Sequence, residues 1–207
     1  MKKPSGKLAK VSGNSSEIDS KVLYDEWAGD YNRDLINEYG YIAPNITVNK
    51  FNVLLPIKDI KIIDVGCGTG LVGKELNKLG YLNIDGYDIS PEMLKIAKQL
   101  DIYKELKQTD LNEGPLTPTK TYDALICVGS FGYGAQDPKA IKNLVALVKS
   151  GGMIFIFMNS EPFNSQNYQE YISKLEKQSL WSVKSIDEYN YMDKLDRPGK
   201  LIIAIKI

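Results

Sequence analysis

The sequence predicts an α/β fold, with a doubly wound, mostly parallel sheet of seven strands that ends in an antiparallel hairpin. After Pro56, short apolar segments alternate with amphipathic ones, which is the pattern of parallel strands connected by helices. Near the end of the chain, two extended segments flank the turn sequence Arg197-Pro198-Gly199, as expected for a hairpin that closes the sheet. Helical spacing of apolar residues before Pro56 adds a group of N-terminal cap helices.

The expected strands and helices of the sheet region are short and bounded by turn residues. The strands are residues 61–65, 83–88, 105–108, 122–128, 153–158, 181–191 and 201–206. Helices are expected at about 70–79, at 91–100 after the N-cap Ser90, at 137–148 and at 168–177. The pair Gly151-Gly152 is expected to form the turn before the fifth strand.

The N-terminal part of the chain is expected to contain helices but no strand. Residues 21–41 carry apolar and aromatic side chains at helical spacing, interrupted at Gly29 and Gly40, which fits two short helices. A third helix is expected from Pro44 to just before Pro56.

The length of the chain favours one domain. We expect a single domain at 21–207, in which N-terminal helices at 21–55 cover an α/β core at 56–207. Residues 1–20 are rich in Lys, Ser and Gly and have few apolar side chains, so we expect them to form a mobile tail.

The composition of the chain argues against several classes of function and partner. The 26 basic and 26 acidic side chains cancel, so no field gathers nucleic acid or anionic lipid, and neither is expected as a partner. No apolar run is long enough to cross a membrane and no signal peptide is recognisable, so a cytoplasmic protein is expected. The absence of histidine removes Ser-His-Asp and Cys-His catalysis and histidine metal sites, and no metal site is expected. Cys67 and Cys127 follow apolar runs and are expected to be free thiols.

The segment Asp64-Val65-Gly66-Cys67-Gly68-Thr69-Gly70 is the most informative part of the sequence. Glycines between a strand and a helix let the backbone turn tightly and approach a ligand at the helix N-terminus. The spacing is GxGxG, whereas dinucleotide sites use GxGxxG, so a nicotinamide oxidoreductase is disfavoured. A tight turn that only packs helix against strand is the alternative interpretation of these glycines.

Asp88 supports a ligand site because of its position. It ends the second strand about twenty residues beyond the glycines, where a carboxylate can accept hydrogen bonds from both hydroxyls of a ribose. We expect the Asp88 carboxylate to serve this purpose and to contribute little to folding.

Residues 24–158 resemble the class I S-adenosylmethionine-dependent methyltransferases, a superfamily with a Rossmann-like fold. The resemblance implies S-adenosylmethionine as the cofactor and Asp64, Gly66, Cys67, Gly68 and Gly70 as its first binding motif. It further implies Asp88 as the ribose ligand, Ile89 and Met93 as an apolar wall for adenine, Asp110 and Leu111 as the pair at the adenine edge, and Cys127 and Ser130 beside the sulfonium.

The aromatic run from Tyr24 to Tyr31, followed by Tyr41-Ile42-Ala43-Pro44, is similar to methyltransferase-like proteins encoded in the Williams–Beuren syndrome region. In such proteins the N-terminal helices cover the cofactor, which implies that Tyr24, Trp27 and Tyr31 line the pocket. These aromatics would equally form the core face of a helix in a protein without such a pocket.

These features predict methyl transfer to a small-molecule acceptor by in-line displacement, a reaction that positioning and desolvation can promote without a dedicated base. Candidate bases are Tyr133, Glu161, Tyr31 and Asp30, and the sequence favours none of them. The segment after the fourth strand lacks the Asn/Asp-Pro-Pro-aromatic sequence of amino-methylating enzymes, and Phe131 with Tyr133 favours an apolar or aromatic acceptor.

The same cofactor motifs also fit a protein of another class. Such a protein would bind S-adenosylmethionine or S-adenosylhomocysteine without turnover and act as an interaction module. No catalytic residue is identifiable in the sequence that would decide between the two.

Overall fold

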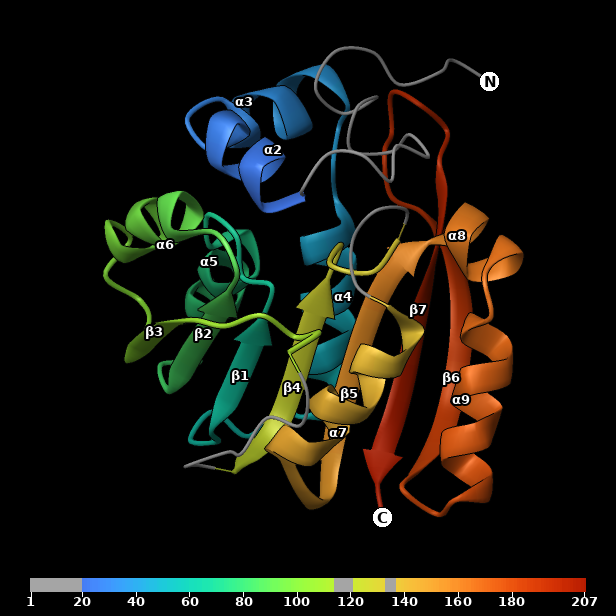
Figure 1. The fold of residues 1–207 in the computed structure, drawn as a ribbon. Helices are drawn as coiled ribbons and strands as arrows, with labels where there is room; N and C mark the ends of the chain where they lie inside the picture. Colours follow the sequence, from blue (N-terminus) through green and yellow to red (C-terminus); the bar gives the residue numbers. More distant parts are fainter. Residues whose placement is uncertain (1–19, 114–120, 133–136) are drawn as a thin grey trace.

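A seven-stranded sheet forms the centre of the computed structural model, which describes residues 20–113, 121–132 and 137–207. The strand order is β3-β2-β1-β4-β5-β7-β6, and β7 runs antiparallel to both of its neighbours (Figure 1). The predicted α/β fold with its closing hairpin is therefore confirmed. The predicted tail lies outside the described residues, except that Ser20 begins the first described helix.

The elements follow the predicted order. The strands are β1 Ile62–Val65, β2 Ile84–Asp88, β3 Glu105–Gln108, β4 Tyr122–Val128, β5 Val148–Asn159, β6 Trp181–Asn190 and β7 Pro198–Lys206. The helices are α2 Ser20–Trp27, α3 Tyr31–Arg33, the π-helix η1 Asp34–Glu38, α4 Ala43–Leu54, α5 Leu71–Lys78, α6 Pro91–Lys98, the 3-10 helix η2 Pro138–Ala140, α7 Ile141–Leu147, α8 Ser160–Ser165 and α9 Tyr168–Lys177.

Two predicted turns are wrong in position. Val148 begins β5 instead of ending a helix, so Gly151-Gly152 lies inside a strand that is locally irregular: Tyr122 pairs with Val148, but Ala124 pairs with Met153. At the hairpin, Pro198 and Gly199 already pair with β6, so residues 191–197 make the connection. Gly151 and Gly152 thus lie in an irregular part of a strand, and Gly199 lies in a crowded strand. Neither set of glycines reverses the direction of the chain.

One helix was not predicted. Asn159 accepts a hydrogen bond from the Glu161 amide (3.1 Å) and so caps α8. With only six residues and a proline within it, this helix shows no detectable apolar period.

Alternating side chains of the strands divide the core into two layers. In β4, Leu125 and Cys127 belong to the cluster that contains α7 and α9, whereas Ala124 and Ile126 belong to the cluster that contains α4 and α5. Figure 1 shows α7 and α4 on opposite sides of the sheet, which makes the fold doubly wound.

The N-terminal segment is joined to the hairpin at the other end of the chain. Tyr41 and Met192 form an antiparallel bridge, and the Ile42 amide donates to the Tyr191 carbonyl at 3.0 Å. Figure 1 shows α2 and α3, hereafter the cap helices, beyond the ends of β1 and β4 to which these strands point. Carboxyl ends of parallel strands are the usual place for a ligand site.

Among the described residues, no helix combines the length and the apolar character required to cross a bilayer.

Candidate active site

A cavity of about 640 Å³, a value that includes the open space at its mouth, lies between the carboxyl ends of the strands and the cap helices. The cavity brings together many of the predicted residues: Tyr31, Gly66, Gly68, Asp88, Ile89, Met93, Leu111 and Ser130. Tyr24, which the sequence also places at the pocket, lines it as well. The lining further includes residues that were not predicted: Tyr87, Thr109, Val128 and Gly129. The remaining predicted residues do not line it: Asp64, Cys67, Gly70, Asp110 and Cys127.

The glycine loop, residues 66–70, forms the floor of the cavity through its backbone. Gly66 has φ +68°, and a Cβ there would lie 1.7 Å from the Ser130 hydroxyl, so only glycine fits. Gly68 has φ +54°, yet a Cβ would meet nothing within 4 Å, because this residue faces open space. The Gly66 and Cys67 amides donate to the Tyr87 carbonyl at 2.7 and 3.0 Å, which fixes the loop against β2.

The third glycine of the loop has a different environment. A Cβ on Gly70 would lie 2.6 Å from Leu100 Cδ1 and 3.3 Å from the Tyr103 ring. Gly70 therefore allows close packing behind the loop.

Asp88 holds the glycine loop as well as facing the cavity. Its Oδ2 accepts a hydrogen bond from the Gly68 amide (2.8 Å) and its Oδ1 from the Ser90 amide (2.9 Å). The expectation that Asp88 contributes little to folding is wrong, because its loss would leave two partly buried backbone donors without an acceptor. Burial raises the pKa of Asp88, and the backbone donors at Ser90 and Gly68 oppose that rise. Each carboxylate oxygen keeps a lone pair for a further donor.

Asp64 is fully buried beneath the floor. Its Oδ2 accepts a hydrogen bond from the Tyr103 hydroxyl (2.7 Å), and its Oδ1 has no hydrogen-bond partner among the described residues. Burial raises the pKa of Asp64 to about 7, against the opposing effect of the Tyr103 hydrogen bond. Tyr103 was not among the predicted residues.

The cap helices form the roof of the cavity with aromatic side chains. Tyr24 and Tyr31 line it, and their rings meet edge to face with centroids 6.1 Å apart. Trp27 is buried and packs behind Tyr31, with centroids 4.8 Å apart. Two of these three aromatics thus line the pocket, and Trp27 supports one of them.

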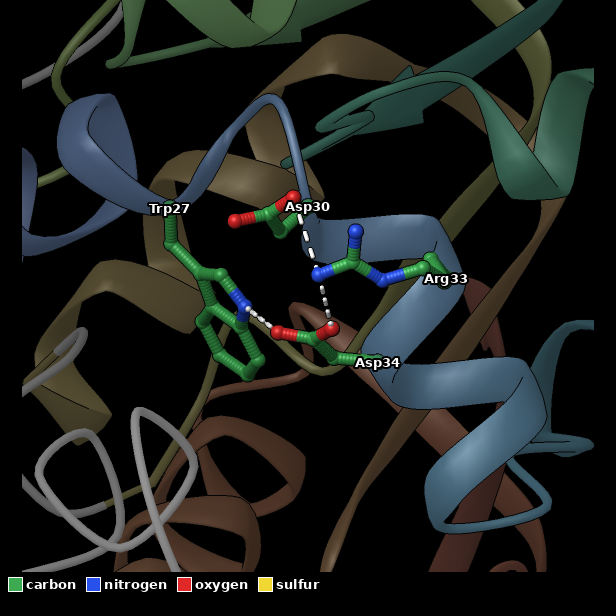
Figure 2. A network of polar contacts seen from close by, with 4 residues as sticks. All are labelled: Trp27, Asp30, Arg33 and Asp34. Atoms are coloured by element: carbon green, nitrogen blue, oxygen red, sulfur yellow. Dashed lines mark hydrogen bonds and ion pairs between the residues drawn. The ribbon is translucent and has the colours of Figure 1, made fainter.

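A polar network orients Trp27. Figure 2 shows the indole Nε1 donating to Asp34 Oδ2 (2.8 Å), while Arg33 contacts both Asp34 (3.1 Å) and Asp30 (3.0 Å). Because the Trp27 indole has its donor satisfied, it can stay buried under the roof.

Two further contacts join the roof to the floor. The Thr69 hydroxyl of the glycine loop donates to Asn32 Oδ1 (2.5 Å), and the Ser90 hydroxyl donates to Asp25. The cap helices are thus attached directly to the loop and to the N-terminus of α6.

Comparison with known proteins gives matches of one kind. Residues 62–152 match the model of a family described as a methyltransferase domain. The chain is 35% identical over 166 residues to methyltransferase-like protein 27 of Homo sapiens, covering 77% of this chain and 66% of the relative. It is 28% identical over 148 residues to a ubiquinone biosynthesis O-methyltransferase of Colwellia psychrerythraea, covering 70% of this chain and 58% of the relative. The chain thus spans 58–66% of the length of these two relatives.

A solved structure has the same fold. The TehB-like S-adenosylmethionine-dependent methyltransferase of Corynebacterium glutamicum superposes with a TM-score of 0.66 at 18% identity, covering 90% of this chain and all of that one. The chain carries a class I S-adenosylmethionine-dependent methyltransferase domain. The superfamily indicated by the sequence is confirmed, and S-adenosylmethionine is the cofactor of this domain.

The cavity of the methyltransferase domain fits this cofactor. Gly68 leaves space above the loop, and the Asp88 carboxylate can accept from hydroxyl groups. Thr109 also lines the cavity. Its Oγ1 is buried without a hydrogen-bond partner among the described residues, as expected of a group that bonds to a ligand. Leu111 and Met93 supply apolar surface there. The Asp110 carboxylate does not line the cavity and instead accepts a hydrogen bond from the Asn112 amide (2.8 Å).

Among the candidate bases that belong to the described residues, only Tyr31 lines the cavity. Burial raises the pKa of Tyr24 to about 12 and raises the pKa of Tyr31 well above its ordinary value, so both phenols stay protonated. Asp30 is paired with Arg33, Glu161 is exposed on α8, and Tyr133 lies outside the described residues. Burial also raises the pKa of Cys127 to about 12, and that of Cys67 as well, so both are protonated, free thiols.

The described residues contain no group of three or more His, Cys, Asp or Glu side chains that could hold a metal ion.

Proposed function

We propose that this chain transfers a methyl group from S-adenosylmethionine to a small-molecule acceptor by in-line displacement. The observation that carries the proposal is the cavity itself. Its floor is a glycine loop held by Asp88, its roof is aromatic, and both lie at the carboxyl ends of the parallel strands. The proposal concerns the described chain, which spans only part of the length of its curated relatives.

We assign the cofactor contacts from the positions of the residues in and around the cavity. Asp88 accepts the ribose hydroxyls, while Ile89, Met93 and Leu111 enclose adenine. Asp110 does not line the cavity, and its place at the adenine edge rests on the resemblance alone. Gly66, Cys67, Gly68 and Gly70 shape the loop under the methionine part, and Asp64 supplies negative charge beneath it. Ser130 and Tyr31 line the cavity and are proposed to face the sulfonium, while Cys127 lies in the core behind Ser130 and is assigned there from the resemblance alone.

S-adenosylmethionine supplies a methyl group that is already activated by a sulfonium. The residues of this chain then contribute orientation and desolvation, which suffice for much of the rate enhancement of a displacement. Tyr24 and Tyr31 exclude water from above, and the backbone of the glycine loop holds the cofactor from below. No general base is assigned.

Three observations favour a small, apolar or aromatic acceptor over nucleic acid. The net charge is zero, and the described lining residues include no Lys or Arg to bind phosphate. The cap helices cover the cavity with the aromatic side chains of Tyr24 and Tyr31. A relative is named as a ubiquinone biosynthesis O-methyltransferase. A cytoplasmic location and the single-domain arrangement remain predictions from the sequence.

Calorimetry and a methyl-release assay test the proposal together. Wild-type protein should bind S-adenosylmethionine and S-adenosylhomocysteine but not NAD, and should release S-adenosylhomocysteine with fractions of a small-molecule extract but not with oligonucleotides. Asp88→Ala serves as the inactive control. Binding without any release would favour the interaction module, and absence of binding at millimolar concentration would refute the proposed function.

A further inference from the structure

Tyr103 stands at the centre of an unusual group of contacts behind the cofactor loop. It precedes β3 and is partly buried, and its ring fills a space left by three glycines from three different elements: Gly70 of the loop, Gly73 of α5 and Gly86 of β2. A Cβ on Gly73 would lie 2.3 Å from the Tyr103 hydroxyl, and a Cβ on Gly86 would lie 3.0 Å from its ring. Glycine at these positions therefore makes room for one particular side chain.

The Tyr103 hydroxyl reaches Asp64 through this space. It donates to Asp64 Oδ2 at 2.7 Å, and no other side-chain donor to Asp64 is present among the described residues. Burial raises the pKa of Tyr103 well above its ordinary value, so the hydroxyl keeps its proton and remains a donor.

We propose that Tyr103 is a positioning residue for cofactor binding, which fixes the Asp64 carboxylate beneath the glycine loop and favours its ionised form. The inference rests on the proposed function in one respect only: it holds that the negative charge of Asp64 helps the protein to select a cationic cofactor. S-adenosylmethionine carries a sulfonium and S-adenosylhomocysteine does not, so an ionised Asp64 favours the substrate form over the product.

The charges around Asp64 explain why the Tyr103 hydroxyl affects the ionisation of this carboxyl group. The titratable groups that interact with it are Cys67 in the loop, Asp88 at the end of β2, Tyr41 after the cap helices, Cys127 in β4 and Tyr103 itself. None of them carries a positive charge. Burial raises the pKa of Asp64 to about 7, close to neutral pH. The Tyr103 hydroxyl opposes this rise most strongly, and the backbone of Gly73 opposes it to a smaller extent.

Tyr103→Phe tests this role because it keeps the ring and removes only the hydroxyl. A carbon-13 NMR titration of the carboxyl groups, with the Asp64 signal assigned by its absence in Asp64→Asn, measures the pKa directly and needs no cofactor. A hydrogen bond to a charged group is worth enough to move the midpoint upward by about one pH unit or more. At pH 7.5 such a shift lowers the ionised fraction from about three quarters to about one quarter, so affinity for S-adenosylmethionine should fall about threefold while that for S-adenosylhomocysteine stays nearly constant.

Tyr81→Phe is the matched control. Tyr81 is also buried, its hydroxyl donates to the Leu55 carbonyl at 2.5 Å, and it is not among the groups that shift the pKa of Asp64. This variant should lose stability without a shift of the Asp64 midpoint. In an Asp64→Asn background, Tyr103→Phe should no longer change the ratio of the two affinities.

The outcomes are distinct. An unchanged Asp64 midpoint in Tyr103→Phe overturns the inference whether or not the cofactor binds. A shifted midpoint with an unchanged affinity ratio overturns the link to cofactor selection. If wild-type protein binds neither compound, the proposed function fails, and the NMR titration still decides whether Tyr103 controls the ionisation of Asp64.

Discussion

The floor and the roof of the cavity are held by different kinds of contact. In the floor, Gly66 and Gly68 adopt positive φ, and backbone amides bond to the Tyr87 carbonyl and to Asp88. In the roof, Tyr24, Trp27 and Tyr31 contribute side chains that touch edge to face, with few hydrogen bonds to the rest of the protein. Backbone geometry permits few residues at each position, whereas aromatic packing tolerates alternatives. Substitutions in the floor should therefore have large effects, and those in the roof small ones.

The largest effect is expected for Gly66→Ala. The added Cβ would clash with Ser130 and occupy an unfavourable φ, so we expect a loss of roughly 2–5 kcal/mol of unfolding free energy together with loss of cofactor binding. Gly68→Ala is the control, because its Cβ meets nothing within 4 Å; it should lose only about 1–2 kcal/mol but still hinder binding, since its methyl group points into open space. Thermal melts and calorimetry measure both. Equal losses of stability would contradict the described packing of Gly66 on Ser130.

Asp64→Asn should have the next largest effect, and one that depends on pH. The folded-state pKa of Asp64 is about 7, above its ordinary value of 3.8, so between these values the folded state binds one more proton than the unfolded state. The contribution of Asp64 to stability is thus most favourable below pH 4 and is lost as the pH rises to 7, by roughly 4 kcal/mol at most. Asparagine cannot ionise, so the melting temperature of the variant relative to wild type should increase from pH 4 to pH 7 and then level off. A constant difference across this range would show that Asp64 is not buried as described.

Asp88→Ala should weaken binding of S-adenosylmethionine at least tenfold, because hydrogen bonds to a charged group are worth about 1.5–3 kcal/mol each. It should also lower stability by about 1–3 kcal/mol, since the Gly68 and Ser90 amides lose their acceptor. Asp88→Asn keeps the shape and one acceptor oxygen, and should lose less stability than Asp88→Ala. Calorimetry beside melts in the absence of ligand separates the two effects. Wild-type affinity in Asp88→Ala would refute the ribose assignment.

The smallest effect is expected in the roof, for Asn32→Ala. This variant removes the acceptor of the Thr69 hydroxyl, so the cap helices should detach more readily at a cost of about 0.5–1.5 kcal/mol. The dissociation rate of the cofactor, measured by stopped-flow fluorescence of Trp27, should rise severalfold. Asn37→Ala, an exposed neighbour on η1, should leave the rate unchanged. Similar rates in Asn32→Ala and wild type would show that the roof does not depend on this contact.

The sequence indicates the cavity residues that belong to local patterns and misses those that depend on tertiary packing. The glycine loop and Asp88 are parts of local strand–loop–helix patterns, so the spacing of a few residues sufficed to place them in the cavity. Thr109 and the contact of Asn32 with Thr69 depend on which side chains tertiary packing brings together, and no local period indicates them. Tyr103 leaves a trace, because Gly73 within a helix and Gly86 within a strand are both unfavourable unless a neighbour needs the space. The irregular start of β5 was missed because Gly151-Gly152 has the composition of an ordinary turn.

The bridge between Tyr41 and Met192 has a consequence for the order in which the protein is assembled. A ribosome makes the cap helices, the glycine loop and Asp88 well before it makes the hairpin to which Tyr41 is anchored. Pairings between such distant segments form late, because the intervening chain must first be ordered. A nascent chain that stops short of Met192 would thus possess the whole floor but no attachment for the segment that leads from the cap. The contacts of Asn32 with Thr69 and of Asp25 with Ser90 need no hairpin, so the segment around Tyr41 is the part of the cap region whose anchoring waits for the hairpin.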